Sequence, residues 1–339
     1  MKALLARKRS SSSLCKQEGS PTPSDRKPRE VKNTQYTHPD YPTMLETRGF
    51  FMRRDRKGVS QESKDFCRTL LETDQEIPED SLFRDDLFEA TCEELQNSNE
   101  AKVIQDIARL IVPSARHLAI RGVEKPKVLT ESVNEGWNNS IPLADITRPQ
   151  PDYAVGFGRS AFAAEQLNKP RPFVGEPTNK SFFMATYYMH FPFLTCEVKG
   201  GTVTLDIADR QNAHSTVLAV SGVVQLFNLV GRIKELDRQI LAFLVSYDQR
   251  TVRIYGHYPV IEEMVTYYRY PIYSFDSTAH DGKEKWTAYK FTKNVYDVWM
   301  PEHFKRLCSA IDQLPAGFSF ELPEQSKLQF QDSALPQGL

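Results

Sequence analysis

The stretch Phe193-Leu-Thr-Cys-Glu-Val-Lys199 decides how this chain of 339 residues folds. Its residues alternate as in a β-strand, so Glu197 and Lys199 share one face while Leu194, Cys196 and Val198 share the other. A buried strand with an acid and an amine on one face needs a reason, because burying charge is costly unless the groups pair or bind a metal. Catalysis and a plain ion pair are the two explanations.

A second apolar run, Asp152-Tyr-Ala-Val-Gly-Phe157, begins 45 residues before Glu197. If these runs are neighbouring strands with Asp152 and Glu197 on one side, the two carboxylates can hold Mg²⁺, which keeps several waters for a substrate phosphate. Such a metal activates water and neutralises developing charge. Lys199 could then orient the attacking water or stabilise the transition state. Each residue type has a chemical role in this hypothesis.

The surrounding segments predict a mixed α/β protein. Gly200-Gly201 ends the strand, and a long helix from about Leu205 to Val230 follows, with a buried arc of aliphatic side chains. Asn99 is expected to cap the second of two earlier helices. The other expected elements are helices near 82–95, 101–112, 286–299 and 302–314, strands near 127–133, 151–157, 182–188 and 266–275, a hairpin of 240–247 with 252–258, and an irregular insertion at 158–180.

Pro151-Asp152 and Glu197-Val198-Lys199, between a leading helix and a long following helix, resemble the PD-(D/E)xK nuclease-like superfamily. The resemblance spans roughly residues 98–260 and implies a restriction-endonuclease-like α-β-β-β-α-β core, classed as α/β (α+β), with additional helices at both ends. The segment from Pro151 to Pro315 also looks like an uncharacterised fungal family grouped with this superfamily, including Arg253-Ile-Tyr-Gly-His-Tyr-Pro259 and Trp286-Thr-Ala-Tyr-Lys-Phe-Thr-Lys293.

This resemblance implies a site for Mg²⁺ or Mn²⁺ and names its residues. Asp152 and Glu197 match the metal ligands, and Glu100 matches an acid that the first core helix often adds. Lys199 and Gln211 match the catalytic lysine and a polar contact from the helix after the third strand. The spacing between Asp152 and Glu197 is longer than usual in the superfamily, so the insertion at 158–192 has to account for it and could gate or disable the site.

Both ends of the chain are expected to lie outside the folded core. The first 32 residues hold nine Lys or Arg against three acids, although the whole chain has a net charge of −1, so the basic excess belongs to a tail. The expected organisation is a disordered basic tail at 1–45, a helical extension at 46–97, the nuclease-like domain at 98–315 and a disordered tail at 316–339. The tail's basic clusters are compatible with nuclear import or with nucleic-acid contact.

Five widely spaced cysteines without a Cys-x-x-Cys pair favour a reducing compartment, nuclear or cytoplasmic. No apolar run has the length of a secretory signal or of a membrane span, so no membrane partner is expected.

Other residue groups favour ordinary structural roles. His190, His214 and His257 lack zinc-ligand spacing, and the tyrosines of 247–273 suit strand packing better than base stacking. Glu131 and Glu135 are a further possible source of site carboxylates.

Two functional hypotheses remain. One is a metal-dependent phosphodiesterase acting on DNA or RNA, and the other is a catalytically silent nuclease-fold module that binds nucleic acid or protein. The near-neutral folded region counts against strong duplex binding, which normally needs a basic surface.

Overall fold

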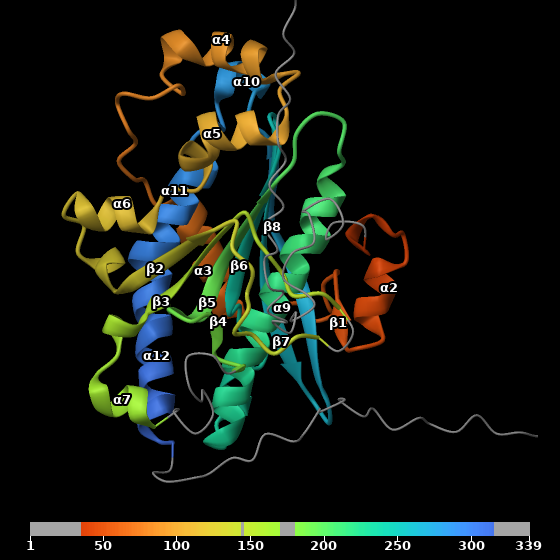
Figure 1. Ribbon diagram of the computed structural model, residues 1–339, viewed down its shortest axis with the longest axis vertical. Helices are drawn as coiled ribbons and strands as arrows, with labels where there is room; N and C mark the ends of the chain where they lie inside the picture. Colours follow the sequence, from red (N-terminus) through yellow and green to blue (C-terminus); the bar gives the residue numbers. More distant parts are fainter. Residues whose placement is uncertain (1–34, 144–145, 170–179, 315–339) are drawn as a thin grey trace, which may run out of the picture.

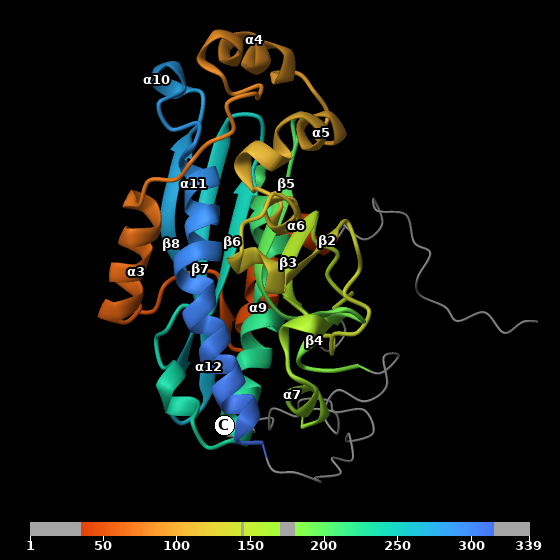
Figure 2. The same cartoon turned by 90° about the vertical axis from the view of Figure 1, so that its left-hand side faces the viewer.

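A computed structural model describes residues 35–143, 146–169 and 180–314 of the protein. It has a mixed eight-stranded sheet with helices on both faces (Figures 1 and 2), as the segment pattern predicts for a mixed α/β protein. The order along the sheet is β1-β8-β7-β6-β5-β3-β2, and β4 pairs with β5. The strands are β1 (Phe50–Phe51), β2 (Leu129–Val133), β3 (Tyr153–Gly158), β4 (Met184–Thr186), β5 (Met189–Val198), β6 (Ala242–Tyr247), β7 (Thr251–Ile261) and β8 (Val265–Asp276).

The pairing changes direction at the centre of the sheet. β5 and β6 run parallel, whereas β2 with β3, β3 with β5, β6 with β7 and β7 with β8 run antiparallel. A parallel pair requires a crossover, and α9 (Leu205–Leu229) provides it. The expected hairpin of β6 and β7 is confirmed, with its turn at 248–250.

The face of the sheet opposite α9 is covered by α3 (Gln61–Glu72), α5 (Glu100–Ile111), α11 (Thr287–Asn294) and α12 (Met300–Asp312) (Figure 2). A π-helical turn, Val295–Trp299, joins α11 to α12, so the two expected closing helices form one continuous rod. The shorter helices are α2 (Tyr41–Glu46), α4 (Asp85–Leu95), α6 (Ala115–Ile120), α7 (Ala164–Asn168) and α10 (Ala279–Gly282). No helix in the described part of the chain is long and apolar enough to cross a bilayer.

The long helix α9 is buried almost all round, more than a one-faced amphipathic pattern predicts. Its inner side packs on β5 and β6, while Ala213 and Val217 meet a second apolar cluster formed with Tyr36, Tyr41 and Leu45. Because that cluster comes from the start of the chain, the expected boundary of the N-terminal tail at residue 45 is wrong. Three apolar residues within ten positions are enough to dock this segment on α9, despite the polar residues between them.

Two other expectations concern segments at the chain ends. The helix α3 lies in the expected N-terminal extension, and its amphipathic pattern, with Cys67 and Leu70 buried, was not recognised as a separate helix. Residues 1–34 and 315–339, which include most of both expected tails, lie outside the described residues.

The insertion between β3 and β5 lies away from the Asp152 end of these strands. Gly158 pairs with Met189 at one end of the ladder, and Tyr153 pairs with Cys196 at the other. At about 3.3 Å per residue, six residues of strand separate the start of the insertion from Asp152 by roughly 20 Å. The described parts of the insertion, α7 and β4, therefore do not gate the expected site; residues 170–179 lie outside the described part.

Gly200 allows the end of β5 to meet the start of α5. A Cβ at this position would lie 2.4 Å from the backbone nitrogen of Glu100 and 2.7 Å from the carbonyl carbon of Asn99. Both obstructing atoms belong to backbone, so neither can rotate away. Gly200 is thus required for close packing.

We expect Gly200→Ala to lower the free energy of unfolding by about 2–3 kcal/mol, because the added methyl forces α5 away from β5. Urea denaturation measures the change. Gly158→Ala is the matched control, since its Cβ would meet nothing closer than 3.7 Å at an ordinary φ of −72°. Equal unfolding midpoints for the two variants would show that the contact is not tight in solution.

Candidate functional site

Five polar residues expected at the site lie at or near one end of β5. We call Asp152, Glu197, Lys199, Glu100 and Gln211 the strand-end cluster. Glu197 is the second-last residue of β5, and Lys199 is the first residue after this strand. Asp152 directly precedes β3. Asp152, Glu197, Lys199 and Gln211 are buried, with exposed fractions of 6%, 2%, 2% and 6%. These charged groups therefore lie inside the protein, where electrostatic interactions are strong.

The ladder between β3 and β5 sets the relation of Asp152 to Glu197. Tyr153 pairs with Cys196 at the end of the ladder, so Asp152, which directly precedes β3, lies beside the end of β5. An Asp152 carboxylate oxygen accepts a hydrogen bond from the backbone N–H of Val198 at 2.8 Å. This bond holds the Asp152 side chain beside the end of β5.

Lys199 connects this strand end to the first turn of α5. Its backbone N–H extends the parallel ladder to the Tyr247 carbonyl at 3.0 Å. Its ammonium donates to the Val198 carbonyl at 2.6 Å and to a Glu100 carboxylate oxygen at 3.4 Å. Glu100 is thus placed in contact with Lys199.

The position of Glu100 follows from the start of α5. The Asn99 side chain caps the helix by accepting from the Lys102 N–H at 3.0 Å, as the sequence predicts. Glu100 then occupies the first helical position, where a carboxylate suits the helix dipole. Close contact through Gly200 brings this carboxylate to Lys199.

Asn212, the residue after Gln211, makes the polar contacts of α9 with the sheet. Its side-chain oxygen accepts from the Thr195 hydroxyl at 2.8 Å, and its amide nitrogen donates to the Val245 carbonyl and the Ser246 hydroxyl, both at 2.9 Å. Sequence reasoning did not identify Asn212. Polar residues at 209, 212 and 216, spaced by three and four, mark this helix face in the sequence.

Asp209 belongs to the same face and is held by β7. Its carboxylate accepts from Arg253 at 2.8 Å and from the Tyr255 hydroxyl at 3.2 Å. Asp209 therefore forms a buried ion pair that links α9 to β7.

Residues near the start of the described chain cover the cluster beside α9. Arg210 donates to the backbone carbonyls of Tyr36 and His38 at 2.8 and 3.2 Å, and the Tyr36 hydroxyl lies 2.9 Å from Nδ1 of His214. Burial, with a smaller effect of the Glu197 charge, raises the pKa of Tyr36 above its usual range. The Glu197 carboxylate therefore interacts electrostatically with the Tyr36 hydroxyl.

The carboxylates at the end of β5 also affect Cys196, which lies on the other face of the sheet. Burial raises the pKa of the Cys196 thiol well above its usual range, and the charges of Asp152 and Glu197 add to the effect. Cys196 is therefore a neutral core residue, facing away from Glu197 as the alternation predicts.

The carboxylates of Glu131 and Glu135 are engaged elsewhere. Glu131 accepts from the hydroxyls of Ser114 and Tyr153 at 2.8 and 2.7 Å and thereby holds the start of α6. Glu135 accepts from the Tyr188 hydroxyl. These contacts assign both residues to structural roles.

No group of three or more His, Cys, Asp or Glu side chains suited to a metal occurs among residues 35–143, 146–169 and 180–314. The strand-end cluster instead has the carboxylates of Asp152 and Glu197 near one strand end, with the Lys199 ammonium nearby. Mg²⁺ commonly uses only one or two carboxylates and completes its shell with water and phosphate, so this donor set fits such an ion.

A model of a protein family described as a domain of unknown function (DUF7924) matches residues 87–311. The chain belongs to this family. No curated protein and no solved structure matches the chain. The matched range holds all five residues of the strand-end cluster, whereas Tyr36 lies before it.

Buried histidines make the fold sensitive to acid. Burial lowers the pKa of His214, His257 and His303 to about 3 and that of His190 to about 4. Below pH 6.5 these histidines are protonated in the unfolded chain, whereas they stay neutral in the folded protein. The free energy of unfolding is therefore highest above pH 6.5, where the histidines are neutral in both states, and it decreases as the pH falls toward 3.

We expect His257→Leu to reduce this acid sensitivity, because neither His257 ring nitrogen has a hydrogen-bond partner within the described chain. Between pH 7 and pH 5 each such histidine lowers the unfolding free energy by about 2 kcal/mol. Urea denaturation of parent and variant at both pH values measures the difference. An equal loss in the two proteins would mean that His257 takes up its proton in the folded state.

Proposed function

We propose that this protein is a Mg²⁺- or Mn²⁺-dependent phosphodiesterase acting on DNA or RNA. The observation that carries the proposal is the Asp152 carboxylate beside the end of β5, where it accepts from the Val198 N–H at 2.8 Å, with Glu197 and Lys199 at the same strand end. Two carboxylates and an amine at one buried point match the needs of metal-assisted phosphate hydrolysis. The proposal concerns the site, since the fold by itself does not define an activity.

The element order supports the resemblance to the PD-(D/E)xK superfamily. Setting aside the short helices and β4, the chain runs α5, β2, β3, β5, α9 and β6, which is the order α-β-β-β-α-β. Asp152 precedes the second of these strands and Glu197 lies on the third. We infer a restriction-endonuclease-like core on this basis.

Asp152 and Glu197 would hold the metal, and Lys199 would act beside it. The bound ion would lower the pKa of a water and neutralise charge on the phosphate. Lys199 would hold a positive charge near the phosphate oxygens, where it stabilises charge that develops in the transition state. Glu100, at 3.4 Å from the Lys199 ammonium, positions that group. Gln211 would add a polar contact from α9.

The burial of the cluster favours a second candidate function, a catalytically silent nuclease-fold module. Asp152, Glu197 and Lys199 are each at most 6% exposed, so a substrate does not reach the carboxylates in this conformation. A silent module would retain the charges as an internal ion-pair network. Metal binding and hydrolysis distinguish the two functions.

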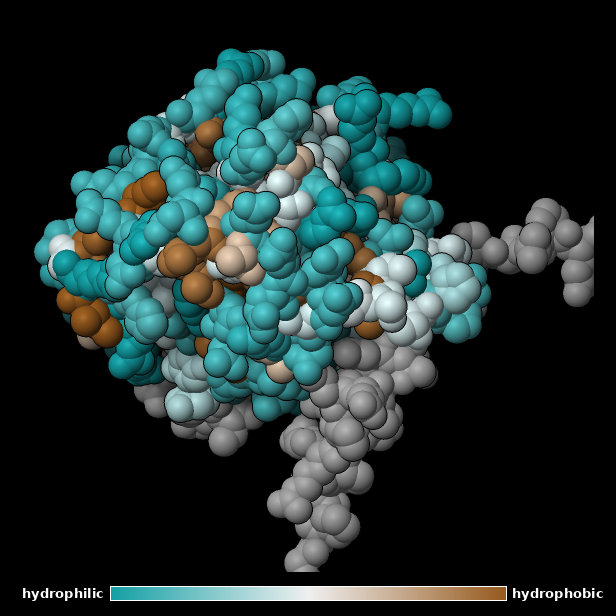
Figure 3. All heavy atoms as spheres, turned by 90° about the horizontal axis from the view of Figure 1, so that it is seen from above, coloured by the Kyte–Doolittle hydropathy of each residue, from teal (hydrophilic) through white to brown (hydrophobic). Residues whose placement is uncertain are grey.

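Nucleic acid is the proposed substrate class, and the surface near the site agrees with a polar partner. Seen from the end that carries α4, α5 and α10, the molecule is mainly hydrophilic, with hydrophobic side chains in separate small groups (Figure 3). Phosphate contacts depend on Lys and Arg, and the sequence concentrates these in its first 32 residues. The proposal therefore requires the full chain in any assay.

We expect the full chain to cleave single- or double-stranded DNA or RNA in Mg²⁺ or Mn²⁺, and Asp152→Asn and Glu197→Gln to lower the rate at least about 100-fold. Both substitutions keep side-chain size and remove the metal-binding charge. Gel assays on labelled substrates measure cleavage, and calorimetry with Mn²⁺ measures metal binding without turnover.

Asp206→Asn is the matched control, because Asp206 is an exposed acid at the start of α9 that pairs with Arg253. Cleavage that survives both cluster substitutions would refute the site. Absence of Mn²⁺ binding and of cleavage in the parent, with retained nucleic-acid binding, would establish the silent module.

We propose different roles for Glu100 and Glu197. Because Glu100 contacts Lys199, we expect Glu100→Gln to lower kcat about tenfold while the Kd for Mn²⁺ stays within about threefold of the parent value. Glu197→Gln is expected to abolish Mn²⁺ binding. Equal losses of Mn²⁺ affinity in the two variants would instead make Glu100 a metal ligand.

A further inference from the structure

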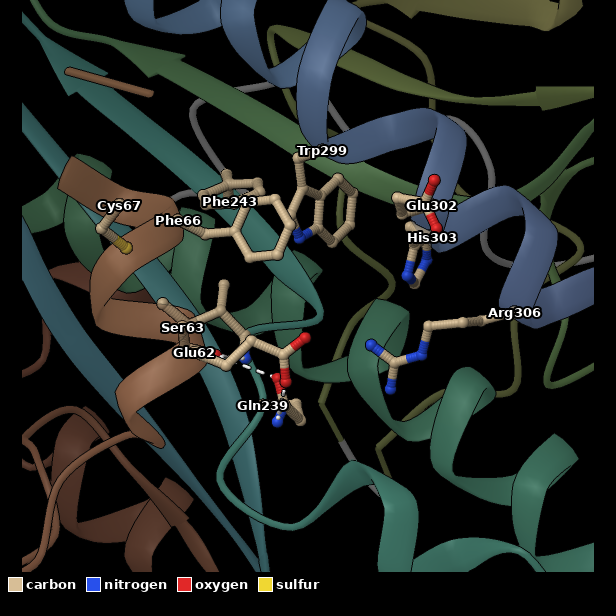
Figure 4. A pocket seen from close by; sticks show the side chains of 11 residues that line it. Glu62, Ser63, Phe66, Cys67, Gln239, Phe243, Trp299, Glu302, His303 and Arg306 are labelled. Atoms are coloured by element: carbon tan, nitrogen blue, oxygen red, sulfur yellow. Dashed lines mark hydrogen bonds between the residues drawn. The ribbon is translucent and has the colours of Figure 1, made fainter. Parts of the chain in front are cut away.

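A cavity of about 200 Å³ lies between α3 and α12, on the face of the sheet opposite α9 (Figure 4). We call it the α3–α12 cavity. Phe243 of β6 forms part of its wall, whereas Ser246, of opposite parity on the same strand, contacts Asn212 of α9. The cavity is therefore separated from the strand-end cluster by the sheet.

Arg306 supplies to this cavity a guanidinium that makes no close polar contact. Its guanidinium projects from α12 toward α3 (Figure 4) and has no hydrogen bond or ion pair with any described residue. The nearby Glu235 is paired with Arg232 at 2.7 Å. Burial lowers the pKa of Arg306, although the charges of Glu62 and Glu235 oppose the shift. A half-buried guanidinium without a partner is costly, and a bound anion would satisfy it.

His303, one turn before Arg306, gives the cavity a buried polar group. The imidazole is 3% exposed, and its Nε2 has no hydrogen-bond partner within the described chain. Its ring points into the same space as Arg306 (Figure 4). Burial and the charge of Arg306 lower the pKa of His303 to about 3, so the ring is neutral and has one donor and one acceptor nitrogen.

Aromatic side chains form the remaining wall. Trp299 stacks on His303, with ring centroids 4.3 Å apart and an interplanar angle of 17°, and Phe66 and Phe243 lie beside it. A cavity of about 150 Å³ is enough to hold benzene, so about 200 Å³ accommodates an aromatic ring with a short polar arm. These aromatic side chains favour a ligand with a flat apolar ring.

Two acids lie at the cavity and restrict the ligand further. Glu62 accepts a hydrogen bond from the Gln239 amide at 3.0 Å, and Glu302 is exposed to solvent. A carboxylate that lies against Arg306 compensates the guanidinium without displacing either acid.

We propose that the α3–α12 cavity binds a small aromatic carboxylate, with its carboxylate on Arg306 and its ring among Phe66, Phe243 and Trp299. His303 donates or accepts one further hydrogen bond. The site is independent of the phosphodiesterase proposal, because it shares no residue with the strand-end cluster.

The test titrates the full chain with 3-phenylpropanoate and with its neutral analogue 3-phenylpropanamide, using ligand-observed NMR up to about 10 mM. We expect saturable binding of the carboxylate and at least about tenfold weaker binding of the amide. Arg306→Gln is expected to weaken carboxylate binding at least about tenfold. Lys305→Gln is the matched control, since it removes the same charge from the exposed neighbouring position and should leave binding unchanged.

Circular dichroism and thermal melting verify that Arg306→Gln folds, which is expected because the guanidinium holds no partner in the described chain. Arg306→Lys serves as a second variant that keeps the charge and should bind the carboxylate more tightly than Arg306→Gln does. The proposal is overturned if the parent shows no saturable binding, if the amide binds as tightly as the carboxylate, or if Arg306→Gln and Lys305→Gln have equal effects.

Discussion

The contact of Asn212 with β5 and β6 fixes the centre of the molecule. Its amide bridges the Thr195 hydroxyl on one strand to a carbonyl and a hydroxyl on the next, at the point where the sheet becomes parallel. A buried amide that lost these bonds would leave several polar groups without partners, at a cost of about 1–3 kcal/mol each. The bonds therefore determine how far α9 lies along β5, and hence what covers Glu197.

The two faces of the sheet differ because of this polar contact. On the α9 face, Asp209 pairs with Arg253, and buried Thr, Ser and Asn side chains follow the helix. On the other face, Phe243 meets Phe291 and Trp299 in edge-on contacts, and α11 and α12 cover an apolar layer. The buried Asp209 on the α9 face is paired, whereas Arg306 on the other face is an exception, with no hydrogen bond or ion pair to a described residue. The exception coincides with the α3–α12 cavity, where close packing fails.

Local patterns in the sequence predict most elements of this fold, because strand alternation and helix periodicity report burial directly. They locate β3, β5, α9 and the β6–β7 hairpin, and they identify Asn99 as a helix cap. They do not predict that Tyr36 and Tyr41 pack on α9, since tertiary contacts over more than 170 residues leave no local signal. The family resemblance brings Glu100 to the site as a metal ligand and does not predict its contact with Lys199, which depends on the absence of a Cβ at Gly200.

The two explanations of Glu197 and Lys199 predict different geometries. A pair kept for stability is expected to have charge-assisted bonds of about 2.7–2.9 Å, as between Arg253 and Asp209 at 2.8 Å on the same face. The Lys199 ammonium instead lies 3.4 Å from a Glu100 carboxylate that keeps 27% of its side chain exposed. Replacing a buried ion pair by apolar residues often costs nothing, so a long and partly wet pair adds little stability. If Asp152 and Glu197 hold a cation as proposed, the contact of Glu100 with Lys199 serves to position the ammonium beside it.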